Sequence, residues 1–366
     1  MFRTIAVCLL TAHVASSQTP DPAKFEAIFK AAHAAGTFDG VAVITADGAT
    51  VLQYAAGMSN REKKVPNTPA TVFRLGSLTK QVTALLVMQE VSAGRVDLEQ
   101  PVGRYLAHLP LEVAAVTVRQ LLIHFSGLQN PSDGPEDRVP PFYLRTGPAA
   151  ADVTENALGF CAAKPKRAPG LQFEYNNCDY IILGAVLESL TGKTYGVLLE
   201  ERVIRPLGLK SWVLAPGDPA RAPVTAAGYQ ENGQPDLFQN PAAYSAAGGL
   251  LGNAMDVAKW NEALLNHKLL SAEATEAMFR ADPTLYGEAL GSWAWDAEVC
   301  KPPVHVVERQ GDIGSTRLLS LLLPGRNASI VIIANTEKAD LFNSYSKKGP
   351  GYEVLRAWFG SMLPSK

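Results

Sequence analysis

Two side chains with complementary chemistry stand three positions apart in the stretch Gly76-Ser77-Leu78-Thr79-Lys80. The residues that follow Gly76 are typical of a helix, and positions three apart lie on one helix face, so Ser77 and Lys80 are expected to meet. A neutral serine needs a base before it can attack a carbonyl group, and a close, partly desolvated lysine can be that base. The backbone N–H of Ser77 is also among those left unpaired at a helix start. The pair indicates a nucleophilic serine.

This spacing by itself has little specificity, because the chain holds a second Ser-x-x-Lys, from Ser344 to Lys347, in a stretch typical of a solvated loop. We interpret that second copy as chance. The first gains support from Tyr175, which opens the only Tyr-x-Asn of the chain. A tyrosine with an ordinary pKa near 10 is a poor base at neutral pH, but a neighbouring cation favours its phenolate. Lys80 would supply that charge.

Two other polar residues are interpreted as structural. His124 lies in Leu-Leu-Ile-His-Phe-Ser-Gly-Leu among apolar neighbours, which favours a core histidine that bonds a loop over a general base. Ser126, two positions on, is interpreted as a turn or cap residue rather than a nucleophile.

The elements that must position these side chains follow from periodicity. Residues 41–45 and 50–54 predict a β-hairpin around Asp47-Gly48, and residues 77–93 a buried helix closed by Gly94. Further helices are expected at 180–190, at 195–203 before Pro206, and from 354 to 362. Strands are expected at 294–296, 305–309, 318–323 and 329–334. Strands at both ends with helices between them indicate one shared sheet with a helical insertion. The Pro/Gly-rich loops 127–148 and 214–245 are expected to form functional rims.

Composition limits the class of protein. With 366 residues, 47% hydrophobic content and a net charge of −2, the chain suits a globular protein with a sizeable core and gives no indication of nucleic-acid binding. Residues 1–17 are typical of a secretory signal peptide, with Arg3 before an apolar run and small residues before Gln18. We therefore expect a secreted or periplasmic protein. The rest of the chain has no apolar run long enough for a transmembrane helix.

The cysteines leave their pairing open. Cys8 lies in the predicted signal peptide, and Cys161, Cys178 and Cys300 remain. An odd count leaves at least one free thiol. A bridge between Cys161 and Cys178 is compatible with the sequence but not required by it, and free, buried thiols are our expectation. No Cys/His spacing resembles a zinc site.

Read together, these motifs resemble the class C β-lactamase-like serine hydrolases. The motifs are Ser77-Leu78-Thr79-Lys80, the stretch around His124, Tyr175-Asn176-Asn177, Ile204-Arg205-Pro206-Leu207-Gly208-Leu209 and Gly248-Gly249-Leu250 onward, in the family's order over residues 25–360. That superfamily includes class C β-lactamases, D-alanyl-D-alanine carboxypeptidases, D-aminopeptidases and esterases. The resemblance implies an antiparallel sheet flanked by helices plus a helical region, with the active site in the groove between them. It also implies roles for four residues: Ser77 as acylated nucleophile, Lys80 as its proton partner, Tyr175 as proton shuttle, and Asn177 as the group that orients Lys80 and substrate.

The third motif departs from the family pattern of Lys or His, any residue, then Gly. Arg309 takes the first position in Arg309-Gln310-Gly311, and Ser315 replaces a small residue in the following turn. By the family pattern the N–H of Asp312, with that of Ser77, would form the oxyanion hole, and Gly311 would let substrate backbone lie against the strand. Arg309 keeps the positive charge and can bind a carboxylate bidentately, but it does not titrate as His does. We expect the change to affect substrate class more than chemistry.

The sequence thus predicts a signal peptide at 1–17 and a hydrolase domain at 18–366. Its α/β part would comprise 18–76 and 285–366, and its mainly helical part 77–284. We expect a monomeric, exported serine hydrolase that needs no metal or organic cofactor and forms an acyl-enzyme on an ester, a D-amino-acid peptide or a β-lactam, whether free or derived from peptidoglycan. The alternatives are a dedicated β-lactamase, a catalytically silent protein that binds peptidoglycan or a partner, and an assembly role for the loops.

Overall fold

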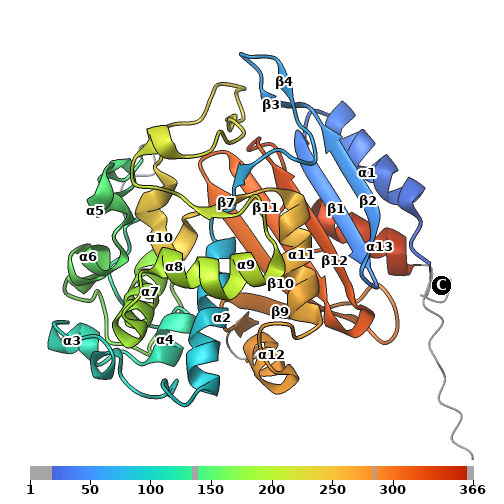
Figure 1. The fold of residues 1–366 in the computed structure, drawn as a ribbon. Coiled ribbons are helices and arrows are strands. Elements are labelled where there is room, and N and C mark those ends of the chain that lie inside the picture. The colour runs from blue at the N-terminus through green and yellow to red at the C-terminus, as the bar shows by residue number, and fades with distance from the viewer. Residues whose placement is uncertain (1–18, 134–138, 283–284, 286, 361–366) are drawn as a thin grey trace, which may run out of the picture.

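Strands from both ends of the chain build one sheet, as predicted. The computed structural model describes residues 19–133, 139–282, 285 and 287–360, so the predicted signal peptide lies outside the described residues. The seven strands are all antiparallel, in the order β2-β1-β12-β11-β10-β9-β8 (Figure 1). Their bounds are β1 Gly40–Ala46, β2 Ala49–Ala56, β8 Glu288–Ala289, β9 Ser292–Ala297, β10 Val304–Ile313, β11 Thr316–Leu323 and β12 Ala328–Ala334.

Both faces of this sheet are covered, which explains why its central strands are almost continuously apolar. Side chains alternate between faces: Val41 and Val43 of β1 pack into the core that contains α2, whereas Ala42 and Ile44 pack into a second core. That second core lies under α1 (Pro22–Ala34) and α13 (Gly349–Phe359). The other face is covered by α2 (Leu78–Ser92), α11 (Ala254–Leu265) and α12 (Ala272–Phe279).

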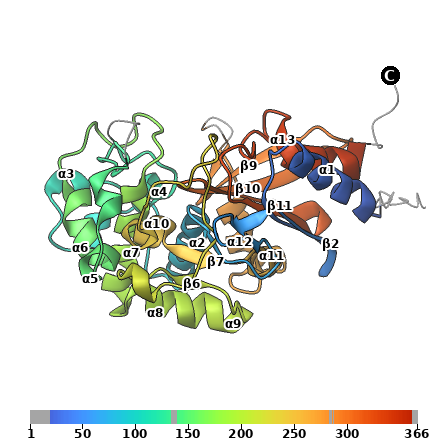
Figure 2. The ribbon, with the colours of Figure 1, turned by 90° about the horizontal axis from the view of Figure 1, so that it is seen from above.

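The helical part of the chain lies beside the sheet, and α2 runs between the two (Figure 2). Most positions of α2 are buried all round, because it contacts β10 and α12 on the sheet side and α7 and α10 on the other. The remaining helices are α3 Leu111–Ala114, α4 Val118–Leu122, α5 Pro148–Ala151, α6 Val153–Leu158, α7 Asn177–Thr191, α8 Tyr195–Leu199, α9 Arg205–Leu207 and α10 Ser245–Gly248. A small sheet joins β5 (Phe73–Arg74), β7 (Leu250–Gly252) and β6 (Val213–Leu214), and β3 (Met58–Asn60) pairs with β4 (Val65–Pro66).

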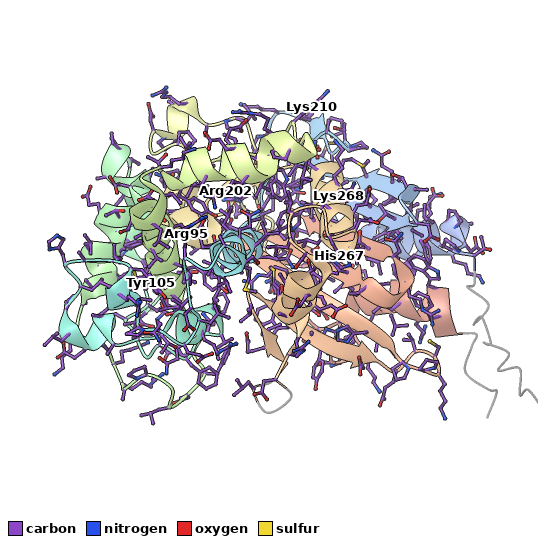
Figure 3. All side chains as sticks on the ribbon, turned by 60° about the horizontal axis from the view of Figure 1, so that its bottom comes forward. Arg95, Tyr105, Arg202, Lys210, His267 and Lys268 are labelled. Carbon is purple, nitrogen blue, oxygen red and sulfur yellow. A yellow bond between two sulfur atoms is a disulfide. The ribbon has the colours of Figure 1, made fainter. Side chains whose placement is uncertain are left out.

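Two ion pairs between side chains hold the C-terminal end of α2, which lies away from Ser77. The carboxylate of Glu90 is fully buried and accepts from Arg95 Nε and Arg202 Nη1, each at 2.5 Å. Figure 3 shows Arg95 and Arg202 close to this end of the helix. A buried carboxylate with two guanidinium partners is a strong positional constraint, because losing either partner leaves an uncompensated charge.

Two predicted helix boundaries are wrong. The helix expected to end before Pro206 continues through a π-helical turn (Glu200–Ile204) into α9, where Pro206 occupies an early position that needs no intrahelical N–H donor. The helix expected from residue 180 begins at Asn177, because the Asn176 side chain caps it by accepting from Cys178 N–H. β10 also runs four residues beyond the predicted end at 309.

No single helix in the described part of the chain is long and apolar enough to cross a membrane. One bent pair, Asn177–Thr191 with Tyr195–Leu207, reaches the length and composition only when both helices are taken together across an 82° bend.

Candidate active site

Ser77 stands at the start of α2, where backbone contacts fix its position. Gly76 precedes it with φ +54°, and a Cβ there would lie 2.8 Å from the backbone nitrogen of Asp312, so only glycine fits the turn. The Ser77 carbonyl oxygen accepts from Arg309 Nε at 2.8 Å. The nucleophile is therefore held against β10 by backbone on one side and by a guanidinium on the other.

Lys80 lies one turn on and is completely buried. Its Nζ donates to Ser77 Oγ at 3.1 Å, to Asn177 Oδ1 at 2.6 Å and to the Ala247 carbonyl oxygen at 2.9 Å. These three acceptors account for all three protons of an ammonium group. Burial lowers the pKa of Lys80 to about 8, Tyr175 opposes that shift, and the charge of Arg309 adds to it. The group is a cation that gives up its proton more easily than a free lysine.

Tyr175 completes the contact set around the serine. Its Oη lies 2.6 Å from Ser77 Oγ and accepts from Arg309 Nη2 at 2.7 Å. Lys80 Nζ lies 4.7 Å from the centre of the phenol ring. Burial raises the pKa of Tyr175, but the charges of Arg309 and Lys80 outweigh burial, and the net pKa lies below its ordinary value. Two cations thus favour the phenolate beside the serine hydroxyl.

Ring packing and hydrogen bonds fix the position of the segment that carries Tyr175. The His124 ring lies 4.5 Å from the Tyr175 ring, centre to centre, and Asn130 Nδ2 donates to the Tyr175 carbonyl oxygen at 3.0 Å. The side chain of Asn176 caps α7 while its Nδ2 donates to the carbonyl oxygens of Leu128 and Gln129. The Tyr175 phenol therefore lies on a loop that is held in place by hydrogen bonds to neighbouring segments.

His124 is the core histidine that the sequence predicted. It is 2% exposed, and its Nδ1 lies 2.8 Å from Asp179 Oδ2 and accepts from Asn176 N–H at 3.2 Å. Burial lowers the pKa of His124 well below its ordinary value and raises that of Asp179 well above it. Both shifts favour the uncharged forms of this buried pair. Ser126 accepts from Leu128 N–H within the following turn, as expected.

Asn177 links the lysine to the wall of the groove. Because a lysine ammonium donates only, the amide oxygen of Asn177 must face Lys80, and its Nδ2 then donates to the Tyr143 hydroxyl at 2.7 Å. The predicted orientation of Lys80 by Asn177 agrees with this contact.

Arg309 makes contacts within the protein that the sequence did not predict. All three of its nitrogens have protein acceptors, namely the Ser77 carbonyl oxygen, Tyr175 Oη and, at 3.5 Å, the Gly291 carbonyl oxygen. The side chain is 1% exposed, and its guanidinium carbon lies 4.8 Å from the centre of a Trp293 ring. A bidentate grip on a substrate carboxylate would require these contacts to break. Its length and planar fork, which sequence reasoning treated as specificity features, instead reach the reacting tyrosine.

Gly311 is also required by a contact within the protein, in addition to the predicted room for substrate backbone. A Cβ at this position would lie 2.2 Å from the Leu75 carbonyl oxygen, so the glycine allows β10 to pack against the turn that carries Ser77. Beyond it, Ile313 and Thr316 close a two-residue hairpin loop and form a hydrogen-bonded pair, so the next pair, Asp312 and Arg317, does not exchange backbone bonds.

The N–H of Asp312 therefore points away from β11, on the side where β9 pairing has already stopped at Glu308. That side holds Gly76 and Ser77. This is the position that an oxyanion-hole donor requires.

These residues line a cavity of about 440 Å³ between the sheet and the helical part. The predicted rim loops contribute Ser132 from 127–148 and Tyr244 from 214–245. Tyr244 stacks on Tyr143, with ring centres 3.9 Å apart and planes at 6°. Gln310 and the aromatic rings of Phe173, Trp293 and Phe342 complete the wall. Sequence reasoning located the two loops but missed these rings, because nothing in a loop composition says which aromatic residue turns inward.

The expectation of free thiols is wrong for two cysteines. Cys161 and Cys178 form a disulfide with their Cα atoms 5.2 Å apart, and Cys300 is the buried free thiol of the described residues. Cys178 is the second residue of α7, directly after Asn177. The bridge therefore ties the start of the helix that presents the Tyr-x-Asn motif to a separate segment of the chain.

Comparison with known proteins agrees with this geometry. The Beta-lactamase family model matches residues 25–344, and the chain belongs to that family. Protein flp of Staphylococcus aureus (strain MW2) is 26% identical over 318 residues, which cover 80% of this chain and 58% of that protein. The chain spans less than three fifths of the length of the curated relatives it matches first.

Solved structures show the same fold. A D-stereospecific amidohydrolase from Streptomyces sp. is 25% identical with a TM-score of 0.73 and covers 94% of this chain and 100% of that one. The octameric penicillin-binding protein homologue from Pyrococcus abyssi has the same TM-score at 23% identity and covers 92% and 76%. The chain thus has the fold of the β-lactamase and penicillin-binding protein type, with the predicted α/β and helical architecture.

Proposed function

We propose that this protein hydrolyses amide or ester bonds next to a D-configured residue through an acyl-enzyme on Ser77. The observation that carries the proposal is the set of contacts around one hydroxyl group. Ser77 Oγ lies 2.6 Å from a phenol oxygen whose pKa is lowered and 3.1 Å from a buried ammonium nitrogen. Since every Lys80 proton already has an acceptor, Tyr175 is the group that can receive the serine proton.

In the acylation step, Ser77 Oγ transfers its proton to the Tyr175 phenolate and attacks the substrate carbonyl carbon. The carbonyl oxygen becomes an oxyanion that accepts from the N–H groups of Ser77 and Asp312. Tyr175 then gives the proton to the leaving amine or alcohol as the bond to carbon breaks. Lys80 and Arg309 stay protonated and hold the phenolate charge, so the leaving group departs neutral and Tyr175 is regenerated.

Deacylation uses the same groups with water in place of the leaving group. Water gives a proton to the Tyr175 phenolate as its oxygen attacks the ester carbon, and the proton passes to Ser77 Oγ as the ester bond breaks. The acid product leaves and the serine hydroxyl is restored. One phenol therefore acts first as base and then as acid in each half-reaction.

The substrate class is proposed from two supports. The Streptomyces relative, at 25% identity over almost the whole chain, is a D-stereospecific amidohydrolase. In this chain the nitrogens of Arg309 are committed to Tyr175 and to backbone carbonyls, which leaves no free cation of the kind that would bind a β-lactam carboxylate at that position. Hydrolysis of D-amino-acid amides or esters is therefore favoured over a dedicated β-lactamase activity. Export through residues 1–17 and a monomeric state remain part of the proposal.

The test combines labelling with a substrate panel. A fluorophosphonate probe should modify the wild-type protein on the peptide that contains Ser77, and Ser77→Ala should lose both the label and all turnover while keeping its circular dichroism spectrum. The panel is D-alanine p-nitroanilide, its L-enantiomer, p-nitrophenyl acetate and nitrocefin. Turnover of the D-anilide above the L-anilide supports the proposal. Label at another serine overturns the mechanism, and absence of any label with retained peptidoglycan binding favours the catalytically silent alternative.

A further inference from the structure

The position of Tyr175, the proposed proton donor, determines which side of the groove binds the leaving group and which side binds the acyl group. Because Tyr175 must protonate the leaving group, the leaving group lies on the side of Tyr175 and Trp293. The acyl part of the substrate must then extend the other way. In that direction a second hollow of about 470 Å³ adjoins the catalytic cavity, and the two share Tyr244 and Asp312 in their walls but not Tyr175.

Asp312 contributes both its backbone N–H and its carboxylate at the junction of the catalytic cavity and the second hollow. Its backbone N–H faces the position of the oxyanion, as the β10–β11 register requires. The residue lines both the catalytic cavity and the second hollow, and it is exposed to solvent. A substrate whose carbonyl oxygen binds the Asp312 N–H would therefore lie beside this residue, at the junction with the second hollow.

The second hollow has one sign of charge. Its wall carries the carboxylates of Asp236, Asp312 and Glu337, and no Lys, Arg or His of the described chain lines it. Asp236 already binds Arg74 at 2.5 Å and the Ser315 N–H at 3.0 Å. Glu337 accepts from the hydroxyl of Ser315 and from a backbone N–H.

Asp312 is the carboxylate of this wall that accepts no hydrogen bond from any described residue, and part of its side chain faces the open groove. Partial desolvation beside the groove raises the pKa of Asp312 to about 6; Arg317 opposes this shift, Glu337 adds to it, and Arg74 opposes it to a smaller extent. Arg317, the cross-strand neighbour of Asp312, donates from Nη1 to the carbonyl oxygens of Glu337 and Ala339 and forms no ion pair with the Asp312 carboxylate. Asp312 is therefore an anion at neutral pH without a cation bound to it.

We propose that the Asp312 carboxylate binds a cationic amino group on the acyl side of the substrate, so that the enzyme selects acyl groups with an unblocked amine next to the reacting carbonyl. In an aminoacyl group the α-nitrogen is two bonds from the carbonyl carbon. A substrate whose carbonyl oxygen accepts from the Asp312 N–H would therefore carry its ammonium group close to the side chain of the same residue. This inference rests on the proposed acyl-enzyme chemistry and adds a specificity determinant to it.

The test compares three substrates that differ only in the charge of the acyl end. D-alanine p-nitroanilide is cationic, its N-acetyl derivative neutral and its N-succinyl derivative anionic. We expect wild-type kcat/KM to favour the cationic over the neutral substrate by about tenfold or more, the scale of one hydrogen-bonded contact to a charged group. Asp312→Asn keeps the backbone and the side-chain shape, and the ratio should fall to within about threefold of unity. Asp312→Lys should favour the N-succinyl substrate.

Glu112→Gln is the matched control, because it removes one negative charge from an exposed position on α3 and should leave the substrate ratio unchanged. Raising the salt concentration should reduce the wild-type preference, because exposed charges are screened. Equal ratios in wild type and Asp312→Asn would overturn the inference, as would a wild type that favours the N-acetyl substrate. Either result leaves the acyl-enzyme proposal standing as long as the fluorophosphonate label stays on Ser77, whereas loss of that label would remove the proposed function itself.

Discussion

Replacing Arg309 by a neutral side chain should move the pH dependence of Ser77 reactivity. Arg309 Nη2 donates to Tyr175 Oη at 2.7 Å, and Arg309 also lowers the pKa of Lys80. Arg309→Met keeps much of the buried volume but removes the charge. The pKa values of Tyr175 and Lys80 should both rise, because a cation that favoured their deprotonated forms is gone.

The size of the shift follows from the contact. A unit charge centred about 4 Å from the phenolate oxygen contributes about 4 kcal/mol at an effective dielectric constant of about 20, or about three pKa units. Tyr175 is partly exposed to the groove, so solvent screening reduces this figure. We expect a shift of about one to two units, which lowers the deprotonated fraction at neutral pH by about 10- to 100-fold.

The assay is the second-order rate of fluorophosphonate labelling of Ser77, measured from about pH 5 to about pH 10, since labelling needs the activated serine but no deacylation. The acidic limb of the Arg309→Met profile should lie at higher pH than that of wild type, with a common plateau in alkaline solution. Arg309→Lys is the matched control, because it keeps a positive charge at this position, and its acidic limb should lie closer to that of wild type than the limb of Arg309→Met does. Thermal unfolding checks that each variant is folded.

Two results would refute this reasoning. If the profiles of Arg309→Met and wild type coincide, the guanidinium does not hold the phenolate, and the short contact has no electrostatic role. If the acidic limb of Arg309→Lys moves as far as that of Arg309→Met, the planar geometry of the guanidinium matters and its charge does not. A change confined to KM for a carboxylate-bearing substrate would restore the interpretation of Arg309 as a substrate-binding residue.

Two further predictions concern the phenol and the disulfide. Tyr175→Phe should lower turnover by about 100-fold or more, the usual scale for losing an acid–base group, while thermal unfolding stays close to wild type; an unchanged rate would exclude Tyr175 from proton transfer. Replacing Cys161 and Cys178 by alanine should lower the free energy of unfolding by about 3 kcal/mol, as expected for a bridge between residues 17 apart in the sequence. Urea denaturation measures this loss, and dithiothreitol should reproduce it in wild type; equal midpoints would show that the bridge does not constrain the unfolded chain.

The sequence was informative wherever a signal is local. The helix after Gly76, the hairpin around Asp47 and Gly48, and the C-terminal strands all appear near their predicted positions, because periodicity and turn residues depend on neighbours along the chain. The motifs around Ser77 and Tyr175 identified the family for the same reason, since each is a short pattern of fixed spacing. The errors in local structure concerned where helices and strands begin and end. At Pro206, for example, a π-helical turn accommodates a residue that usually stops a helix.

What the fold alone decided is which distant groups touch. Arg309 contacts a tyrosine 134 positions away, and Tyr175 reaches a serine 98 positions away. No spacing rule describes such contacts, because they depend on how β10 and the helical part close around α2. The close approach of Gly311 to the Leu75 carbonyl oxygen and the Cys161–Cys178 bridge depend on the fold in the same way. The residue type determines which reactions a side chain can take part in. Its pKa and its hydrogen-bond partners depend on the neighbouring charges and the solvent exposure that the fold produces.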